Sequence, residues 1–359
     1  MYDYVIVGAG LFGATCAYLL KGKKILVIDS KGHVAGNCYT EEKEGIHVHM
    51  YGPHIFHTSN KSVWEFVNKF AHFNNFVNRP KAFNNGRLYS LPINLTTLAQ
   101  VYGVRTPQEA TIRLQERVVK LKEPQNLEEF CLSEIGPELY NLLIRDYTRK
   151  QWQTDPKNLP AEIIKRLPVR LTYDDNYYDS KYQGIPEEGY THIVKKLLEG
   201  VTVALNTDFF DDRLSLKSIS RKIIYTGPID RYFDYQFGEL EYRTNRFEHE
   251  RISKSDYQGN AIVNYCDMST DLTRIIEHKH FTNFQSDYTY VTRDYPDSWD
   301  KSKTPMYPIN TVKNNAIYKR YKDLASKEQN VLFGGRLATY QYLDMHQIIN
   351  QAMVLCKSL

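Results

Sequence analysis

The first 29 residues constrain this chain more than any other stretch. An apolar run is followed by a glycine-rich turn, a short helical stretch and a second apolar run that ends at Asp29. Gly8 allows the tight turn, Gly10 lets backbone approach a pyrophosphate, and Gly13 allows close packing of helix on strand. Asp29 is placed to accept a hydrogen bond from a ribose hydroxyl. The pattern predicts a βαβ unit that binds a dinucleotide, whereas an ordinary buried glycine turn would leave Asp29 unexplained.

Composition limits the classes of partner. The chain has 359 residues, enough for two or three domains. Its positive and negative residues are well mixed and sum to +4, so we expect no nucleic-acid partner. The five cysteines are scattered without a CxxC pair, which indicates neither a metal site nor a redox dithiol. No apolar run approaches the ~20 residues of a membrane helix. The glycine pattern begins too early for a signal peptide. We therefore expect a cytoplasmic protein with reduced thiols and no membrane insertion.

Four histidines fall close together at positions 47, 49, 54 and 57. Metal binding needs supporting ligands, and no cysteine or acidic cluster accompanies them. We therefore predict no metal. One of these histidines is better placed to line a cofactor or substrate, and a satisfied loop histidine is the alternative.

The remaining pattern predicts an α/β fold. Asn85-Gly86 between two short runs indicates a hairpin, and residues 94–152 have helical periodicity, with starts at Pro107, Leu127 and Pro137. Residues 240–295 contain strand-like runs typical of an antiparallel sheet. We expect a Rossmann-like FAD-binding domain over 1–77, completed by 183–227 and 315–359. A helical insertion with a mobile lid would span 78–165, and an antiparallel substrate domain would span 166–182 and 228–314.

The glycine-rich loop after Asp29 is typical of proteins that bind FAD. No second glycine fingerprint follows, which disfavours a reductase with a separate NAD(P)H domain. No Ser-His-Asp or Cys-His arrangement stands out, so a cofactor would supply the difficult chemistry. Gly334-Gly335 would let backbone approach a ring, and the N-terminus of the helix capped by Asp344 could stabilise negative charge on a reduced flavin.

Six motifs resemble the bacterial UDP-galactopyranose mutase family. They are Tyr51-Gly-Pro-His54-Ile-Phe-His57-Thr, Tyr147-Thr-x-Lys-Gln-Trp152, Arg166-x-Pro-Val-Arg170, Tyr225-Thr-Gly-Pro-Ile-Asp230, Thr273-Arg274-Ile-Ile-Glu-His and Gly334-Gly-Arg336-Leu-x-x-Tyr-x-Tyr342-x-Asp344-Met345. The resemblance covers nearly the whole chain. It departs from the usual pattern at Ala35 in place of glycine, Asp29 and Asp294 in place of glutamate, and Arg149 in place of an acid.

The resemblance implies a redox-neutral isomerase that interconverts UDP-galactopyranose and UDP-galactofuranose. In such enzymes N5 of reduced FAD forms a covalent adduct with the anomeric carbon while UDP leaves and returns. The product supplies galactofuranose for cell-surface polysaccharide. The resemblance also implies a homodimer and a cellular reductant that keeps the flavin reduced.

By motif match, the resemblance assigns three sets of residues. Catalytic roles fall to Arg166, Arg274 and His54. Substrate contacts fall to Asn78, Tyr147, Thr148, Trp152, Arg166, Tyr177, Asn264, Arg274, Tyr307, Arg336 and Tyr342. Cofactor contacts fall to Gly8, Gly10, Leu11, Phe12, Gly13, Asp29, Ser30, Gly36, Asn37, His54, Ile55, Thr226, Gly227, Gly335, Arg336, Tyr342, Asp344 and Met345. The arginines would grip the diphosphate, and Tyr147 would stack on the base.

Three alternatives stay open at this stage. The same chemistry could act on UDP-N-acetylgalactosamine or a dTDP-6-deoxyhexose, because one pocket contact can decide between sugars. A true FAD oxidoreductase resembling the amine oxidases would need no second dinucleotide site. A non-catalytic nucleotide-sugar binder is the third, and the retained arginines and glycines argue against it.

Overall fold

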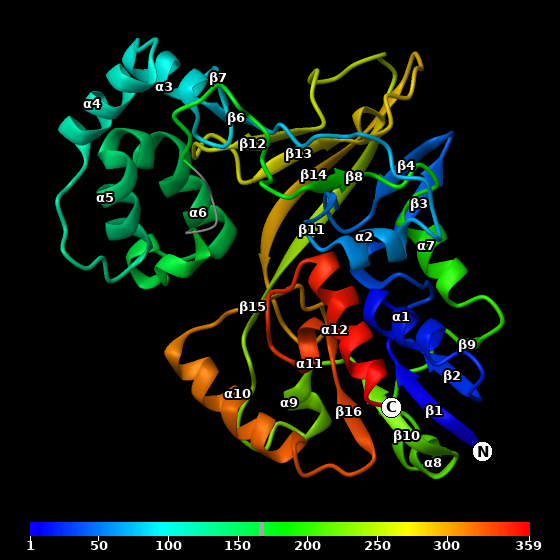
Figure 1. The fold of residues 1–359 in the computed structure, drawn as a ribbon. Coiled ribbons are helices and arrows are strands. Elements are labelled where there is room, and N and C mark those ends of the chain that lie inside the picture. The colour runs from blue at the N-terminus through cyan, green and yellow to red at the C-terminus, as the bar shows by residue number, and fades with distance from the viewer. Residues whose placement is uncertain (165–168) are drawn as a thin grey trace. The chain divides into compact units, whose positions relative to one another are not determined.

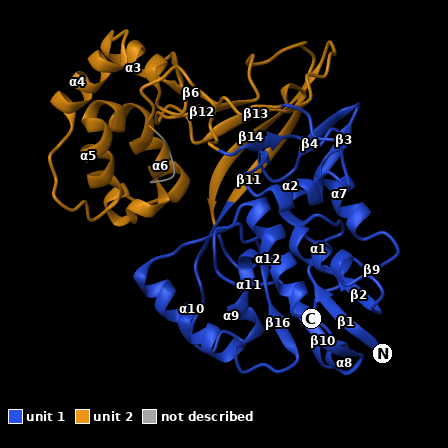
Figure 2. Cartoon of the chain, in the orientation of Figure 1, with its two compact units in different colours: residues 1–75, 180–244, 299–359 blue, residues 76–179, 245–298 orange. Residues whose placement is uncertain are grey.

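The computed structural model describes residues 1–164 and 169–359. The chain forms two compact units, shown in Figure 2. Unit 1 comprises Met1–Asn75, Ser180–Thr244 and Trp299–Leu359, and unit 2 comprises Phe76–Asp179 and Asn245–Ser298. The helical segment and most of the second sheet, which the sequence analysis separates, therefore lie in the same compact unit.

A five-stranded parallel sheet forms the centre of unit 1, with strand order β16-β10-β1-β2-β9. Its strands are β1 (Tyr2–Val7), β2 (Ile25–Ile28), β9 (Thr202–Ala204), β10 (Ser220–Tyr225) and β16 (Val331–Phe333). Strand β2 is apolar and buried throughout, and β1 and β10 each contain a buried apolar run, as expected for a sheet covered on both faces. The predicted βαβ unit is confirmed: β1 leads through the glycine turn into α1 (Leu11–Leu19) and then to β2.

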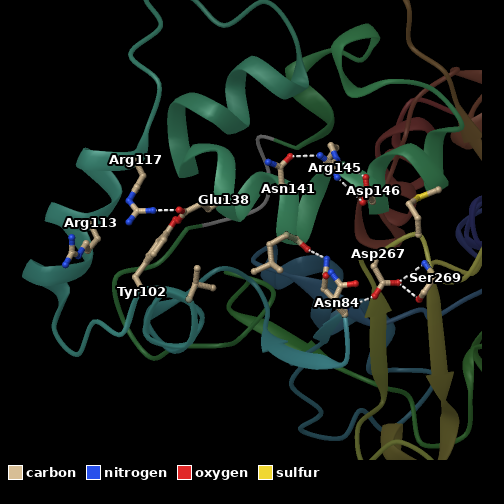
Figure 3. A pocket seen from close by; sticks show the side chains of 14 residues that line it. Asn84, Tyr102, Arg113, Arg117, Glu138, Asn141, Arg145, Asp146, Asp267 and Ser269 are labelled. Carbon is tan, nitrogen blue, oxygen red and sulfur yellow. Dashed lines mark hydrogen bonds and ion pairs between the residues drawn. The ribbon is translucent and has the colours of Figure 1, made fainter.

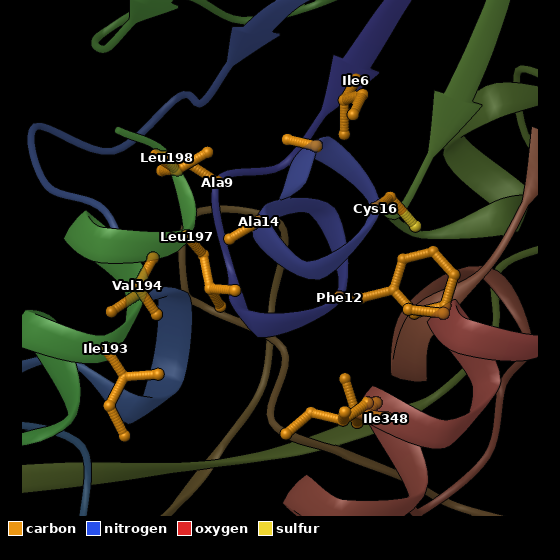
Figure 4. Packing of buried hydrophobic residues seen from close by; sticks show 14 of the residues in the cluster. Ile6, Ala9, Phe12, Ala14, Cys16, Ile193, Val194, Leu197, Leu198 and Ile348 are labelled. Atoms are coloured by element: carbon orange, nitrogen blue, oxygen red, sulfur yellow. The ribbon is translucent and has the colours of Figure 1, made fainter. Parts of the chain in front are cut away.

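Helix α1 is packed between α7 (Tyr190–Leu197) and α12 (Met345–Lys357), which come from distant parts of the sequence (Figures 1 and 4). Phe12 and Cys16 on α1, Ile193 and Leu197 on α7, and Ile348 on α12 belong to the same buried cluster (Figure 4). This cluster fixes the N-terminus of α1 at the carboxyl edge of the sheet. The other elements of unit 1 are β3 (Thr40–Lys43), β4 (Ile46–His49), β5 (Phe56–Thr58), α2 (Lys61–Val67), β8 (Tyr182–Gly184), α8 (Arg213–Ser218), α9 (Ile229–Tyr232), β15 (Tyr307–Pro308), α10 (Val312–Ala325) and α11 (Gly335–Ala338).

The second sheet has seven strands in the order β15-β11-β14-β13-β12-β6-β7. Strand β11 (Tyr242–Ile252) begins in unit 1 and continues in unit 2. Strand β15 belongs to unit 1, and the remaining five strands belong to unit 2: β6 (Lys81–Asn84), β7 (Arg87–Ser90), β12 (Ile262–Tyr265), β13 (Arg274–Glu277) and β14 (Thr289–Ser298). The predicted Asn85-Gly86 hairpin joins β6 to β7, and both turn residues have positive φ. Every pairing described within unit 2 is antiparallel except that between β6 and β12, which is parallel.

The helices of unit 2 begin close to where the sequence signals place them. They are α3 (Leu95–Tyr102), α4 (Pro107–Arg117), α5 (Leu127–Leu139) and α6 (Arg145–Trp152). Thr106 caps α4 just before its proline, and Asn126 caps α5. Gly136, with φ of 75°, interrupts α5 before the predicted start at Pro137, and a π-helical turn over Tyr140–Ile144 then leads into α6. The helical path is therefore interrupted just before the Tyr147 motif.

Candidate active site

Of the three glycines in the turn after β1, only Gly10 has room for a side chain. A Cβ on Gly8 would lie 2.0 Å from Thr226 Oγ1, and a Cβ on Gly13 would lie 2.0 Å from the Gly8 carbonyl oxygen. These two glycines are required by the protein's own packing. A Cβ on Gly10 would meet only the Cα of Gly36, at an ordinary 3.8 Å. The apoprotein could accept a side chain at Gly10, so its glycine is best explained by a ligand that approaches the backbone there.

The loops that follow β1, β2, β10 and β16 all leave the carboxyl edge of the parallel sheet, where ligands bind in folds of this kind. Asp29 Oδ2 accepts from the Ala9 amide at 2.8 Å, and Oδ1 accepts from the Lys31 amide at 2.9 Å. Its carboxylate therefore fixes the glycine turn in addition to the predicted ribose contact, which stays a prediction. Ser30 next to it is exposed.

The loop after β2 lies against the glycine turn. The Ala35 amide donates to the Ala9 carbonyl at 2.9 Å, and Ala35 has φ of 76°. An alanine in this left-handed conformation carries strain that a glycine would not. Lys31 Nζ donates to Asn37 Oδ1 at 3.2 Å. Burial raises the pKa of the Cys38 thiol to about 12, opposed by the positive charges of Arg336 and Lys31, so this thiol is an inert packing residue rather than a nucleophile.

The glycines after β16 bring the C-terminal motif to this edge. A Cβ on Gly334 would lie 2.1 Å from the ring of Phe12, so the Phe12 side chain is a packing residue. The guanidinium of Arg336 donates to the carbonyls of Met306, at 3.2 Å, and Leu343, at 2.6 Å. It lies 4.9 Å from the centre of the Tyr342 ring, which stacks on Tyr307 at 5.5 Å. The structure thus groups three predicted site residues: Tyr307, Arg336 and Tyr342.

The histidine segment contributes a folded loop beside β4. His54 Nδ1 donates to the Gly52 carbonyl at 2.9 Å, and its backbone amide donates to His49 Nδ1 at 3.1 Å. Ile55 beside it is buried. His57 Nε2 lies 3.9 Å from Asp344 Oδ2, and His346 completes a group of three possible metal ligands that the sequence analysis did not foresee. The Asp344 carboxylate already caps α12 in the predicted way, within a capping box.

A row of polar residues crosses three neighbouring strands of unit 2. Asn264 on β12 is the register partner of Arg274 on β13, which in turn faces Asp294 on β14. Residues directly opposite one another share a face of the sheet. Arg274 Nε lies 2.9 Å from Asp294 Oδ2, and Asp294 is only 1% exposed. Burial raises the pKa of Asp294, while Arg274 and a hydrogen bond from Asn245 oppose that shift.

Helix α6 carries the aromatic residues of the predicted nucleotide site and packs against β14. Tyr147 and Trp152 are half-buried, and Thr148 is buried. Burial raises the pKa of Tyr147 to about 12, and its hydroxyl feels the charges of Arg274 and Asp294. Tyr147 therefore stays neutral at physiological pH beside the polar row.

Two further predicted residues meet in the adjoining segment. The Tyr177 amide donates to the Asn78 carbonyl at 2.8 Å, and Asn78 is buried. Arg170 holds the same loop through the Asn176 carbonyl and the Asp179 carboxylate. Arg166, which the resemblance makes catalytic, lies outside the described residues.

The UDP-galactopyranose mutase family model matches residues 142–342, and a model for NAD(P)-binding Rossmann-like domains matches residues 6–70. The dTDP-fucopyranose mutase of Escherichia coli is 41% identical over 98% of this chain and 97% of its own length.

The chain belongs to the UDP-galactopyranose mutase family.

Other comparisons agree with this membership. The probable UDP-galactopyranose mutase of Klebsiella pneumoniae is 40% identical over 98% of this chain and 93% of its own length. A crystal structure of reduced UDP-galactopyranose mutase matches with a TM-score of 0.76, covering 99% of this chain and 93% of that one, at 14% identity. At that identity the match supports the fold alone. The predicted fold class and family are both confirmed.

Sequence reasoning missed one residue of the family motif on α6. Lys150 is 7% exposed, and its ammonium donates to the carbonyls of Tyr265, Thr270 and Leu272 at 2.9, 3.1 and 2.8 Å. It anchors the helix that carries Tyr147. The signal was a lysine within a motif of nucleotide-site residues, but the acceptors lie more than a hundred residues away in the sequence.

An open polar pocket of about 890 Å³ lies elsewhere in unit 2 (Figure 3). Its three arginines contact neighbouring side chains: Arg113 pairs with Glu116, Arg117 with Glu138, and Arg145 with Asp146 and Asn141. None of the predicted site residues that the structure describes lines it. Among the described residues, no helix is long and apolar enough to cross a membrane.

Proposed function

We propose that this protein is a flavin-dependent mutase that interconverts the pyranose and furanose forms of a nucleotide-activated hexose, with UDP-galactose as the first candidate. The observation that carries the proposal is the Asn264–Arg274–Asp294 row in unit 2 of a chain that belongs to the mutase family. A guanidinium paired with a buried carboxylate suits recognition of a diphosphate.

The residues of unit 1 fit FAD. Gly10 leaves the backbone open at the N-terminus of α1, where amide groups and the helix dipole favour a pyrophosphate. Gly335, with φ of 81°, and the N-terminus of α12 lie in the segment that would face the flavin ring, with His54 and Ile55 as further contacts. Reduced FAD, when bound, would supply the nucleophilic nitrogen that displaces UDP from the anomeric carbon without net redox change.

The remaining work falls to the protein's own side chains. Tyr147 would stack on the base, and Thr148, Trp152, Asn78 and Tyr177 would contribute to the nucleotide pocket of unit 2. Arg274, with Arg166 and Arg336, would neutralise the diphosphate as its negative charge grows during bond cleavage. The hydroxyls of Tyr307 and Tyr342 would donate to the phosphates, and Asn264 would contact the sugar.

The sugar itself is the open part of the proposal. Relatives at nearly equal identity carry two names, one for dTDP-fucopyranose and one for UDP-galactopyranose. UDP-N-acetylgalactosamine remains a third substrate that one altered contact could admit. We further propose a cytoplasmic homodimer that is kept reduced by a cellular flavin reductant and supplies furanose units for cell-surface polysaccharide.

The test is an anaerobic assay with dithionite-reduced protein and each nucleotide furanose in turn, followed by chromatography of the nucleotide sugars. The proposal predicts many turnovers to the pyranose with no stoichiometric consumption of reductant, and one substrate should dominate in kcat/KM. Stoichiometric oxidation with a new product would instead support the amine-oxidase-like alternative. Purified protein that cannot bind flavin would refute both.

A further inference from the structure

Arg274 is the first of four polar side chains in contact, of which the middle two are buried and the last lies on helix α6. Its guanidinium contacts one oxygen of Asp294, Oδ2, at 2.9 Å. The other oxygen, Oδ1, accepts from the side-chain amide of Asn245 on β11 at 2.5 Å. Asn245 Oδ1 in turn accepts from Gln151 Nε2 at 3.4 Å. All four residues belong to unit 2, so the connection does not depend on how the two units are placed.

Each contact in this chain sets the orientation of the next residue. Asn245 is 7% exposed, and its amide has one donor end and one acceptor end. Because Gln151 donates to the acceptor end, the donor end of Asn245 faces Asp294. That donor matters because Asp294 is fully buried and its charge is costly without partners. Asp294 offers one oxygen to Arg274 and therefore needs Asn245 for the other.

Gln151 occupies a distinctive place on α6. It lies four residues after Tyr147, so the two side chains share one face of the helix. Its Oε1 atom is buried and accepts no hydrogen bond from the described residues. The same helix face thus presents the tyrosine expected to hold the base and the glutamine that begins the path to Arg274.

We propose that Gln151 and Asn245 are positioning residues for the mutase reaction, which set Arg274 through Asp294 and couple its placement to the nucleotide-binding helix. This inference rests on the proposed function, because it assigns Arg274 to the diphosphate. Asn245 and Gln151 need not touch the substrate. Aspartate has a shorter side chain than the glutamate usual at position 294, and Asn245 bonds its Oδ1 atom.

Negative charge on the leaving diphosphate is greater in the transition state than in the bound ground state. Displacing Arg274 should therefore destabilise the transition state more than the bound substrate. Replacing Asn245 by leucine keeps a similar volume and removes the donor. We expect kcat to fall about 10–100-fold and KM to change by less than about 3-fold, in line with the cost of a small misplacement near the reacting groups. Affinity for UDP should weaken by roughly 3–10-fold, or about 0.7–1.4 kcal/mol.

The experiment is a double-mutant cycle on reduced holoenzyme with Asn245→Leu, Gln151→Met and the pair. Gln151→Met alone should lower kcat in the same direction. Because Gln151 acts through Asn245, Gln151→Met should lower kcat by less than about a further 2-fold when Asn245 is already leucine. His249→Ala is the matched control: His249 contacts Thr292 at 2.8 Å between the same strands, β11 and β14. His249→Ala should leave kcat near the wild-type value. When it is combined with Gln151→Met, the effects of the two substitutions on kcat should be additive.

FAD content and melting temperature are measured for every variant. The proposal is overturned when Asn245→Leu keeps kcat, or lowers it only as much as His249→Ala at an equal loss of stability. It is also overturned when Gln151→Met lowers kcat as much in the Asn245→Leu variant as in the wild type, since Gln151 would then act directly on the ligand. A wild-type protein without mutase activity would refute the proposed function, and the same cycle measured on UDP binding would still decide the coupling.

Discussion

Replacing Lys150 by methionine tests how helix α6 is held. Methionine keeps the apolar stem and removes the ammonium that donates to three carbonyls of the β12–β13 connection at 2.8–3.1 Å. Burial lowers the pKa of Lys150, because the buried ammonium loses hydration, and the charges of Asp267 and Asp146 oppose that shift.

The magnitude follows from two opposing contributions. Three charge-assisted hydrogen bonds at about 1.5–3 kcal/mol each are lost. The desolvation of the ammonium, which costs several kcal/mol, is no longer incurred. We expect a net loss of about 2–4 kcal/mol. For a unit of roughly 150 residues this lowers the melting temperature by about 5–15 °C.

The measurement is thermal unfolding followed by circular dichroism, together with the dissociation constant for UDP. Arg149→Met on the same helix is the control, because Arg149 is exposed and pairs with Asp155 at 2.9 Å at the surface. Such pairs contribute at most about 1 kcal/mol, so its melting temperature should fall by less than about 3 °C.

UDP affinity should fall for Lys150→Met, because Tyr147 lies on the loosened helix, and stay unchanged for Arg149→Met. If Lys150→Met melts within about 2 °C of the wild type and binds UDP equally well, the ammonium does not anchor α6 and the reasoning fails.

Three other predictions concern the cofactor turn, the base and a half-buried histidine. Gly10→Ala should fold with a near-normal melting temperature but lose most FAD, because its Cβ meets only an ordinary contact within the protein. Gly13→Ala should lose FAD and also unfold at a lower temperature, because its Cβ would clash with backbone. Flavin absorbance and calorimetry distinguish the two variants, and equal behaviour would contradict the assignment of Gly10. Tyr147→Ala should weaken UDP binding by about 1–3 kcal/mol of stacking energy and Tyr147→Phe should not, as isothermal titration would show; equal losses would point to the hydroxyl instead. The pKa of His280 is raised by the Glu277 carboxylate, which lies 3.3 Å from its Nε2 atom, against the effect of burial and with help from the charge of Asp256. The stability it contributes is therefore fully present below its unfolded pKa of ~6.5 and is lost as pH rises through the raised value. Denaturant unfolding from pH 6 to 9 should show this loss, and His280→Gln should flatten it; an unchanged slope would exclude His280 as the source.

Several local features of both units follow from nearby sequence alone. The glycine turn, the Asn85-Gly86 hairpin, the Pro107 helix start and the Asp344 cap were each predicted and found, because backbone strain and capping act within a few residues. The family resemblance was likewise carried by short motifs, and the comparisons confirm it.

The long-range placements could not be deduced in this way. Strand register alone sets Arg274 opposite Asp294, and Lys150 finds its carbonyls more than a hundred residues further along the chain. Nothing local marks Asn245 or Gln151 as partners, because a one-residue shift of β11 would turn Asn245 to the other face of the sheet. The sequence by itself determined which chemistry this protein carries and where its helices and turns begin. Only the tertiary structure decided which buried groups hold that chemistry in place, because such contacts depend on the packing and register of segments that are far apart in the chain.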